Sequence, residues 1–529
     1  MSATDAIPSP LTANSPVRRN AMLPWWVAFA LVALTWGLEL YALWAHPYAP
    51  LVDLPNHMAR HYLESVRLRG GELPPFYAVE WRPLPNLGAD FVTPVLMLIF
   101  RPEIACKVFL TLSVLLYWIG PAAFLMECLG RKPQALAASL LLLPWTFTGH
   151  FFWGFLNYYS AVGLAFLVLA HHLRLARRER VPVGGLLLHA ALVVLLYFWH
   201  LAPWVLYCVI VGCRVAGDLV RGPDGVRARL LRGARALAPI VPSLLLFAVY
   251  FLGNRGVNPE GGWDWGGWGR KLLGPLEIFA GYDLRVDLPA CMLWAAAVAA
   301  TFAMPRFKDL AKGWLPLALA ALSAVYLILP LQLGSTNEAD TRVLPVLFVV
   351  ALAAVGSAPL RRPRLGAVLL AACLLLRFGS ILHAWDGLCG RLDADARSFA
   401  VFAPGDRVLP VVLLPERSKN YPEYHFAAWA VPGRGAFLPT LFAQSDQQPL
   451  RIVPPYAFAA GLPKGCNGPD ACTLREAPLR DKYDYVWLYN PVGKAVRAPA
   501  SFSRVFSEGA VTVWRVPHDR ADLAAGAGR

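Results

Sequence analysis

Three side chains with complementary chemistry stand close together near the start of the chain, at Asp53, His57 and Arg60. Their spacing of four and then three residues places them on one face of a helix. A carboxylate at such a site can accept a proton from a hydroxyl group, and an imidazole can hydrogen-bond beside it. A guanidinium can pair with a phosphate. The structural alternatives are that Asp53 only caps the helix and that Arg60 binds lipid headgroups.

The element that would position these side chains is a short amphipathic helix beginning at Asp53, a good N-cap residue, with Pro55 in its first turn. The opposite face carries apolar residues at helical spacing, namely Leu54, Met58, Tyr62 and Val66. A charged segment that contains prolines cannot sit in lipid with its backbone groups unsatisfied. We therefore expect this helix to lie in the plane of the membrane interface.

The whole chain has the composition of a polytopic membrane protein, because 57% of its 529 residues are hydrophobic and only 16% are charged. A formal charge of +15 could suggest nucleic-acid binding, but most Arg and Lys residues fall in short loops between apolar runs. About eleven of these runs are long enough to span a membrane. They are 22–45, 103–129, 134–152, 154–173, 183–199, 201–219, 237–253, 288–304, 314–333, 343–359 and 365–384.

The basic clusters between the runs predict one topology, since all of them fall on the same side if the N-terminus is cytoplasmic. The expected domains are a disordered cytoplasmic tail at 1–20, a transmembrane domain at 21–385 with a long periplasmic loop at 46–102, a periplasmic α/β domain at 386–518, and a disordered tail at 519–529. Within the α/β domain we expect a helix at Tyr421–Ala430 and strands at Val408–Leu414, Tyr485–Tyr489, Ser503–Phe506 and Val511–Val516.

Other candidate residues lie on the same predicted side of the membrane. Arg342 begins a late span, where a guanidinium suits a departing phosphate, although an interfacial snorkelling arginine is the alternative. Trp263 and Trp265 could stack on sugar rings or form an aromatic belt. Glu39 is a costly carboxylate within the first span, and it could line a cavity or bond a neighbouring helix. The remaining candidates, which could equally be ordinary interfacial polar groups, are Asn56, His150, Asn157 and His200.

The sequence contains few motifs that indicate a cofactor. Asp53 and His57 supply only two metal ligands, so we predict no metal cofactor, and a divalent ion stays an option without a ligand set. The chain shows no P-loop, so energy must come from an activated substrate or a gradient. Cys466 and Cys472 flank a polar segment and predict a disulfide, which requires an oxidising compartment.

The arrangement resembles the GT-C superfamily of membrane glycosyltransferases, which use polyprenyl-phosphate sugars and include protein mannosyltransferases and the aminoarabinose transferases of lipid A. The likeness rests on an acidic residue soon after the first span, an interfacial helix in a long first loop, many further spans and a C-terminal outer domain. The segment Asp340-Thr341-Arg342-Val343-Leu344-Pro345 is similar to the start of a later span in many members. This chain has Asp53-Leu54 where many members have an Asp-Glu pair.

The resemblance implies an inverting glycosyl transfer at the periplasmic face of a bacterial inner membrane, with Asp53 as the general base. It implies a polyprenyl-phosphate sugar as donor and a lipid, polysaccharide or protein of the cell envelope as acceptor. Arg60 and Arg342 would hold the donor phosphate, and no nucleic acid would bind. A transporter or flippase of lipid-linked glycans, a polymerase of such glycans and a non-catalytic assembly factor are the alternative classes.

Overall fold

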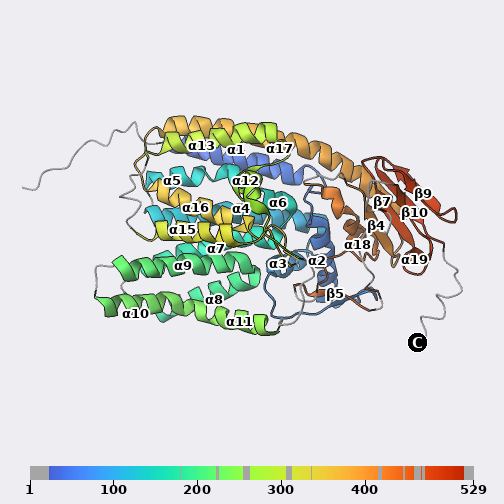
Figure 1. The fold of residues 1–529 in the computed structure, drawn as a ribbon, viewed down its shortest axis with the longest axis horizontal. Helices are drawn as coiled ribbons and strands as arrows, with labels where there is room; N and C mark the ends of the chain where they lie inside the picture. The colour runs from blue at the N-terminus through green and yellow to red at the C-terminus, as the bar shows by residue number, and fades with distance from the viewer. Residues whose placement is uncertain are drawn as a thin grey trace, which may run out of the picture.

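The computed structural model describes residues 23–130, 132–178, 180–221, 225–253, 262–304, 313–334, 336–414, 420–444, 447–454, 456–457, 466 and 471–517. The tails predicted at 1–20 and 519–529 lie outside these residues. Figure 1 shows a bundle of helices with α2, α3 and the C-terminal strands at one end and the start of α10 at the other.

Seven of the described helical segments are long and apolar enough to cross a membrane. They are α1 (Trp25–Trp44), α4 (Pro102–Leu129), α7 (Leu156–Ala176), α9 (Leu201–Arg221), α10 (Val226–Leu237) continued through η3 (Ala238–Ile240) into α11 (Val241–Gly253), α13 (Leu284–Thr301) and α17 (Pro363–Ala396). Four shorter apolar segments contain α5 (Pro133–Leu140), α8 (Val183–Trp199), α15 (Leu315–Ile328) and α16 (Leu344–Gly356). Each predicted apolar run therefore contains a helix, and the predicted polytopic α-helical fold is confirmed.

Close contact between α4 and α7 forms the centre of the bundle. Gly120 of α4 and Gly163 of α7 face each other, and a Cβ atom at either position would overlap the backbone of the other helix. Small residues at such positions let two helix backbones approach in a membrane, where packing replaces the hydrophobic effect as the source of association.

The apolar run at 134–152 is not one helix. It contains α5, the short turn η2 (Leu143–Trp145) and α6 (Gly149–Trp153). Pro144 in this run lacks a backbone N–H group and interrupts helical hydrogen bonding. Arg377 of α17 satisfies the freed carbonyls, donating to Pro144 O at 2.9 Å and to Phe147 O at 2.5 Å. A buried arginine therefore makes the break tolerable inside the bundle.

The C-terminal region contains a four-stranded sheet with the order β4 (Val408–Val412), β7 (Tyr485–Tyr489), β10 (Val511–Arg515) and β9 (Ser503–Glu508). β4 and β7 are parallel and the other pairs are antiparallel, so the last two strands, β9 and β10, form a hairpin. The segment predicted as one helix at Tyr421–Ala430 instead forms short turns at η6 (Pro422–Tyr424) and η7 (Phe426–Trp429), followed by α18 (Ala430–Arg434).

Short strands tie the first long loop to this C-terminal region. β1 (Tyr77–Val79) pairs antiparallel with β5 (Leu450–Ile452), although some 370 residues separate them, as the register Ala78↔Arg451 shows. Cys466 and Cys472 form a disulfide beside β6 (Cys472–Thr473), which pairs with β8 (Val496–Arg497). The remaining elements are α12 (Gly267–Phe279), β2 (Trp263–Asp264), β3 (Gln332–Leu333), η4 (Thr341–Val343), η5 (Arg397–Val401) and α19 (Ala477–Arg480).

The helix predicted after Asp53 is confirmed as α2 (Leu54–Leu68), and its position in the interface plane stays a prediction. α2 packs against α3 (Gly88–Leu96) and against η7 of the C-terminal region. Arg60 and Glu64 on its polar face are buried, as are Met58 and Leu63 on its apolar side. The reason is that α3 supplies Asp90, a carboxylate that lets the arginine leave water.

Candidate active site

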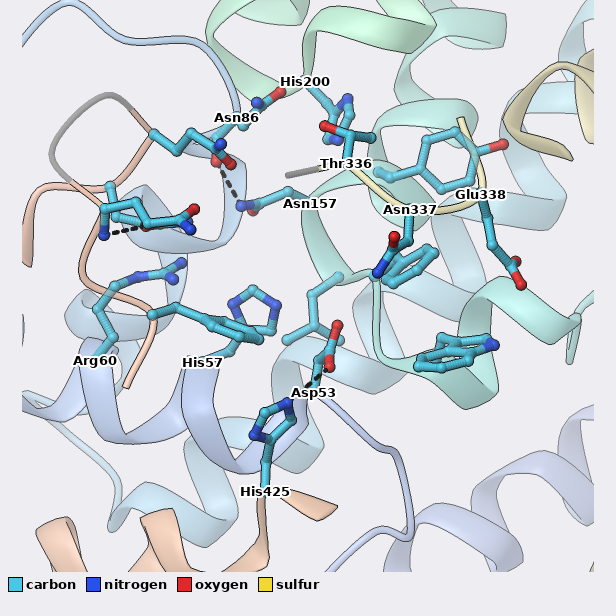
Figure 2. A pocket seen from close by; sticks show the side chains of 18 of the residues that line it. Asp53, His57, Arg60, Asn86, Asn157, His200, Thr336, Asn337, Glu338 and His425 are labelled. Atoms are coloured by element: carbon cyan, nitrogen blue, oxygen red, sulfur yellow. Dashed lines mark hydrogen bonds and ion pairs between the residues drawn. The ribbon is translucent and has the colours of Figure 1, made fainter. Parts of the chain in front are cut away.

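A cavity of about 320 Å³ opens where Asn86 of the first long loop meets five other parts of the chain. These parts are the start of α2, the α6–α7 turn, the α8–α9 turn, the loop before η4 and the C-terminal segment 424–448. Figure 2 shows its polar side chains pointing inward from these elements. The predicted residues that line it are Asp53, His57, Arg60, Asn157, His200 and Arg342.

The side chain of Asp53 lines this cavity and does not cap its own helix. It occupies the N-cap position of α2, yet its side chain accepts no hydrogen bond from the first turn. Its backbone N–H donates to Trp153 O at 2.9 Å, which fixes the start of α2 against the α6–α7 turn. Gly154 in that turn has φ of 79°, and a Cβ there would lie 3.1 Å from the Asp53 nitrogen. Asp53 is therefore not a helix cap alone, and a glycine allows its backbone to approach this closely.

The surroundings of Asp53 shift the pKa of its carboxyl group. Its side chain is 16% exposed, and Oδ1 lies 3.6 Å from His425 Nε2 (Figure 2). Burial raises the pKa of Asp53 to about 7, and the charge of Arg342 acts in the opposite direction. Burial lowers the pKa of His425 to about 4, so this imidazole is neutral at neutral pH. A carboxyl group with a pKa near the working pH is suited to act as a general base.

Arg342 lies across the cavity on η4 and is held by neutral groups. Its Nη2 donates to Asn337 O at 3.2 Å, and its Nη1 lies 3.5 Å from His200 Nε2. The guanidinium carbon lies 4.7 Å above the ring of Phe155 and 5.5 Å from the ring of Tyr158. Two aromatic faces, an imidazole and a carbonyl orient this cation without neutralising its charge.

The acidic residues near Arg342 have other partners. Asp340 accepts a hydrogen bond from Lys271 Nζ at 2.7 Å, and Glu338 lies 3.5 Å from Arg270 Nη2. Within the described part of the chain no carboxylate forms an ion pair with Arg342, and its Nε is buried without a hydrogen-bond partner. This leaves a positive charge in the cavity wall that an anionic ligand could neutralise.

Arg60 differs from Arg342 because its charge is already compensated. Its Nε and Nη2 donate to the two carboxylate oxygens of Asp90 at 2.7 and 3.1 Å, and Asn157 Nδ2 donates to the same carboxylate at 3.4 Å. Although burial opposes ionisation, Arg60 and His61 hold the pKa of Asp90 well below its usual range. Burial and the charge of Asp90 raise the pKa of Glu64, whose Oε1 lies 3.6 Å from Arg60 Nε. One nitrogen of Arg60, Nη1, is buried without a partner.

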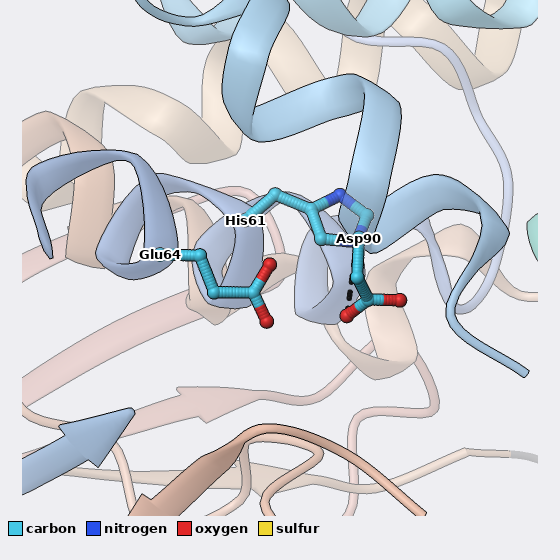
Figure 3. A group of neighbouring side chains, drawn as sticks. All are labelled: His61, Glu64 and Asp90. Atoms are coloured by element: carbon cyan, nitrogen blue, oxygen red, sulfur yellow. Dashed lines mark ion pairs between the residues drawn. The ribbon is translucent and has the colours of Figure 1, made fainter. Parts of the chain in front are cut away.

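Part of this network is the only group among the described residues whose side chains could hold a metal ion. Ligand atoms of His61, Glu64 and Asp90 all lie within 4.8 Å of one another (Figure 3). Both oxygens of Asp90 are bonded to Arg60, so a cation here would share that carboxylate with a guanidinium. The donor set therefore fits an internally neutralised network better than a metal centre.

Several predicted residues lie away from the cavity. Glu39 is buried in α1 and accepts a hydrogen bond from Thr146. His150 lies 3.0 Å from Thr341 Oγ1 and lines a neighbouring cavity. Asn56 is buried within α2, with no hydrogen-bond partner among the described side chains. Trp263 is exposed on β2, and Trp265 Nε1 donates to Leu327 O; neither lines the cavity of Asp53.

The structure adds residues that sequence reasoning missed. His425 and three glutamines come from the C-terminal segment and close one side of the cavity, and Asn86 comes from the first long loop. The glutamines are Gln444, Gln447 and Gln448. Asn86 O accepts from Asn157 Nδ2 at 2.5 Å, and its side chain accepts from the Leu201 N–H at 3.0 Å. The cluster of three glutamines within five residues was the one local signal of a polar binding surface.

Comparison with solved structures shows what fold this is. The chain is similar to ArnT from Cupriavidus metallidurans bound to undecaprenyl phosphate, with a TM-score of 0.53 and 14% identity over 93% of this chain and 98% of that one. The apo state of the same protein gives a TM-score of 0.52 over the same shares. No family model matches the sequence. No curated protein matches it either.

The likeness extends over nearly the whole of both chains, from the helical bundle through the C-terminal strands. At this identity the likeness shows the fold alone, and the predicted helical membrane architecture with a C-terminal strand-containing region is confirmed. What the site does must be argued from its own residues.

Proposed function

We propose that this protein is a membrane glycosyltransferase that moves a sugar from a polyprenyl-phosphate donor to a hydroxyl group of a cell-envelope acceptor. The observation that carries the proposal is one cavity faced by Asp53, with a pKa raised to about 7 by burial, and by Arg342, which has no acidic partner among the described residues. The cavity thus has a base on one side and, on the other, a cation without an ion-pair partner. This arrangement suits a reaction that removes a proton on one side and releases a phosphate on the other.

The proposed reaction is a single inverting displacement. The acceptor hydroxyl gives its proton to Asp53 as its oxygen forms a bond to the anomeric carbon of the sugar. The bond between that carbon and the phosphate oxygen breaks, and the electron pair leaves on the polyprenyl phosphate. The guanidinium of Arg342 stabilises the added negative charge. Arg60 offers Nη1 as a second donor, and its pairing with Asp90 keeps it rigid.

A neighbouring cavity supports a lipid-linked donor. It has a volume of about 490 Å³ and shares Trp153 and Glu338 with the cavity of Asp53. Leu273 and Leu284 line it and are exposed on the surface of the bundle, as expected for an opening toward lipid. We assign the first isoprene units of the donor to this opening. Undecaprenyl phosphate is the lipid in the ArnT structure of the same fold.

The proposed location is the bacterial inner membrane, with the N-terminus in the cytoplasm and the cavity at the periplasmic face. The basic loops between the spans support this orientation. The disulfide between Cys466 and Cys472 supports an oxidising compartment for the C-terminal region. In this arrangement the region at 386–518 is a periplasmic domain whose glutamine-rich segment binds the acceptor.

The proposal is tested with purified protein, a radiolabelled polyprenyl-phosphate sugar and an envelope extract as the source of acceptor. Transfer releases free polyprenyl phosphate and moves the label into acceptor. A flippase would move intact donor across a vesicle membrane, and a polymerase would lengthen the glycan on its own lipid carrier. Release of polyprenyl phosphate that equals labelled acceptor supports transfer, and movement of intact donor without release contradicts it.

A further inference from the structure

A second large cavity lies at the end of the bundle opposite to α2 and α3 (Figure 1). Its volume is about 530 Å³, and it lies among the ends of α7 and α9, the start of α8 and the whole of α10. It shares no lining residue with the cavity of Asp53. Nothing in the proposed transfer reaction uses it, so its purpose must be inferred from its own chemistry.

The cavity is strongly basic. Five arginines and one acidic residue line its described wall, namely Arg177, Arg178, Arg214, Arg232 and Arg235 against Asp218. Arg177 forms an ion pair with Glu127, which does not line the cavity; Arg177 Nη1 lies 2.6 Å from Glu127 Oε2. Arg178 and Arg235 form no ion pair with any carboxylate in the described part of the chain. The wall therefore carries more positive charge than its own residues compensate.

The polar groups continue into the bundle, which distinguishes this cavity from ordinary basic loops at a membrane surface. Arg214 is 16% exposed, and its Nη1 lies 3.0 Å from Nε2 of the buried His172. Nε2 of the buried His189 lies 2.9 Å from the hydroxyl of Tyr207. Arg214 also forms an ion pair with Asp218 at 3.6 Å, and His189 Nδ1 lies 3.0 Å from His171 Nδ1. The inner wall is therefore polar but already partnered, and an anionic group would pair with Arg178 and Arg235.

The rim of the same cavity is apolar. Leu186 and Leu231 line it, and Leu231 is 52% exposed. Leu187 and Leu188 of α8 and Leu230 of α10 are exposed beside it. α10 thus contributes two arginines to the wall, Arg232 and Arg235, and two leucines at or beside the rim, Leu230 and Leu231. A ligand that enters here needs an anionic head for the wall and hydrocarbon for the rim.

We propose that this cavity binds the phosphate headgroup of an anionic membrane phospholipid, with its acyl chains lying along the exposed leucines of α8 and α10. Basic pockets between membrane helices bind such headgroups by Coulomb attraction and charge-assisted hydrogen bonds. The chemistry recognised is a phosphate ester, which a free phosphate compound could also supply. The inference does not depend on sugar transfer, because the two cavities are separate.

The test uses the full-length protein, delipidated in detergent and titrated with phosphatidylglycerol or phosphatidylcholine, with retained lipid counted by native mass spectrometry. The variant R178Q/R235Q removes the two unpaired guanidinium groups. The matched control R227Q/R364Q removes the same charge from exposed arginines outside the cavity. We expect phosphatidylglycerol to bind the first variant about 30-fold more weakly than the wild type, from two lost arginine contacts, and the control normally.

A third variant, R178K/R235K, keeps the charge and is expected to retain phosphatidylglycerol, so misfolding cannot imitate the result. Equal binding of phosphatidylglycerol by the wild type and R178Q/R235Q would overturn the proposal. Equal binding of phosphatidylglycerol and phosphatidylcholine to the wild type would also overturn it. Inorganic phosphate is titrated as a third ligand. Binding of inorganic phosphate to the wild type, without any retained phosphatidylglycerol, would assign the cavity to a free phosphate compound and overturn the lipid source.

Discussion

Replacing Arg342 with glutamine tests whether one guanidinium serves both the departing phosphate and the catalytic base. No described carboxylate forms an ion pair with Arg342, so its guanidinium can pair with a phosphate. Loss of one preorganised donor to a developing anion costs about 2.7–4 kcal/mol, which is a 100- to 1000-fold fall in kcat. The same charge lowers the pKa of Asp53 against the effect of burial, so the substitution also changes the base.

The assay is the rate of label transfer as a function of pH. Protonated Asp53 cannot accept a proton, so the wild-type rate rises with pH through a midpoint near the pKa of about 7. In R342Q burial acts unopposed and the midpoint moves to higher pH. R342K keeps the charge, so the midpoint of its pH profile should stay at the wild-type value. Its rate should fall, because lysine cannot make the bidentate contact of a guanidinium with a phosphate.

R82Q is the control for this experiment, because Arg82 is half exposed in an ion pair with Glu80 and lies outside the cavity. Its rate and midpoint should match those of the wild type. An R342Q variant that keeps the wild-type rate would refute the phosphate role. An R342Q variant that is slow but keeps the wild-type midpoint would refute the electrostatic link to Asp53.

Two predictions concern stability. G163L should prevent the close approach of α4 and α7, because a side chain there meets the backbone at Leu116, and the variant should elute as aggregate in size-exclusion chromatography. G37A has open space at its Cβ and should elute normally; a monodisperse G163L would contradict the packing. R60M leaves Asp90 buried without its cation and should lower stability by about 3–5 kcal/mol, seen as a lower unfolding temperature in detergent. An unchanged temperature would show that the pair is dispensable.

Much of this architecture could be predicted from local patterns. Apolar runs of membrane-spanning length mark most of the helical segments of the bundle, because each must satisfy its own backbone in lipid. α10 precedes the run predicted at 237–253, and α12 lies outside all the predicted runs. Asp53 and Arg342 were identifiable as polar residues at the ends of apolar runs, where a charge is tolerated only at an interface or a cavity. The strands of the last hairpin follow from alternating β-branched and aromatic residues.

The rest depends on contacts between distant parts of the chain. Nothing near Arg60 shows that Asp90, thirty residues later, neutralises it, so its burial and that of α2 could not be predicted. The run at 134–152 looks continuous, and its break at Pro144 is stable only because Arg377 reaches it from α17. The closure of the cavity by His425 depends on the packing of η7 against α2, which no local pattern encodes.

The central claim is that the carboxyl group of Asp53 removes the proton from the acceptor. The most direct measurement is single-turnover transfer by D53N, an almost isosteric variant, in protein shown to be inserted and monodisperse. Removing a general base should slow transfer by about 100- to 10,000-fold while binding of the donor, which depends on Arg342, stays close to that of the wild type. Transfer by D53N at the wild-type rate would contradict the account.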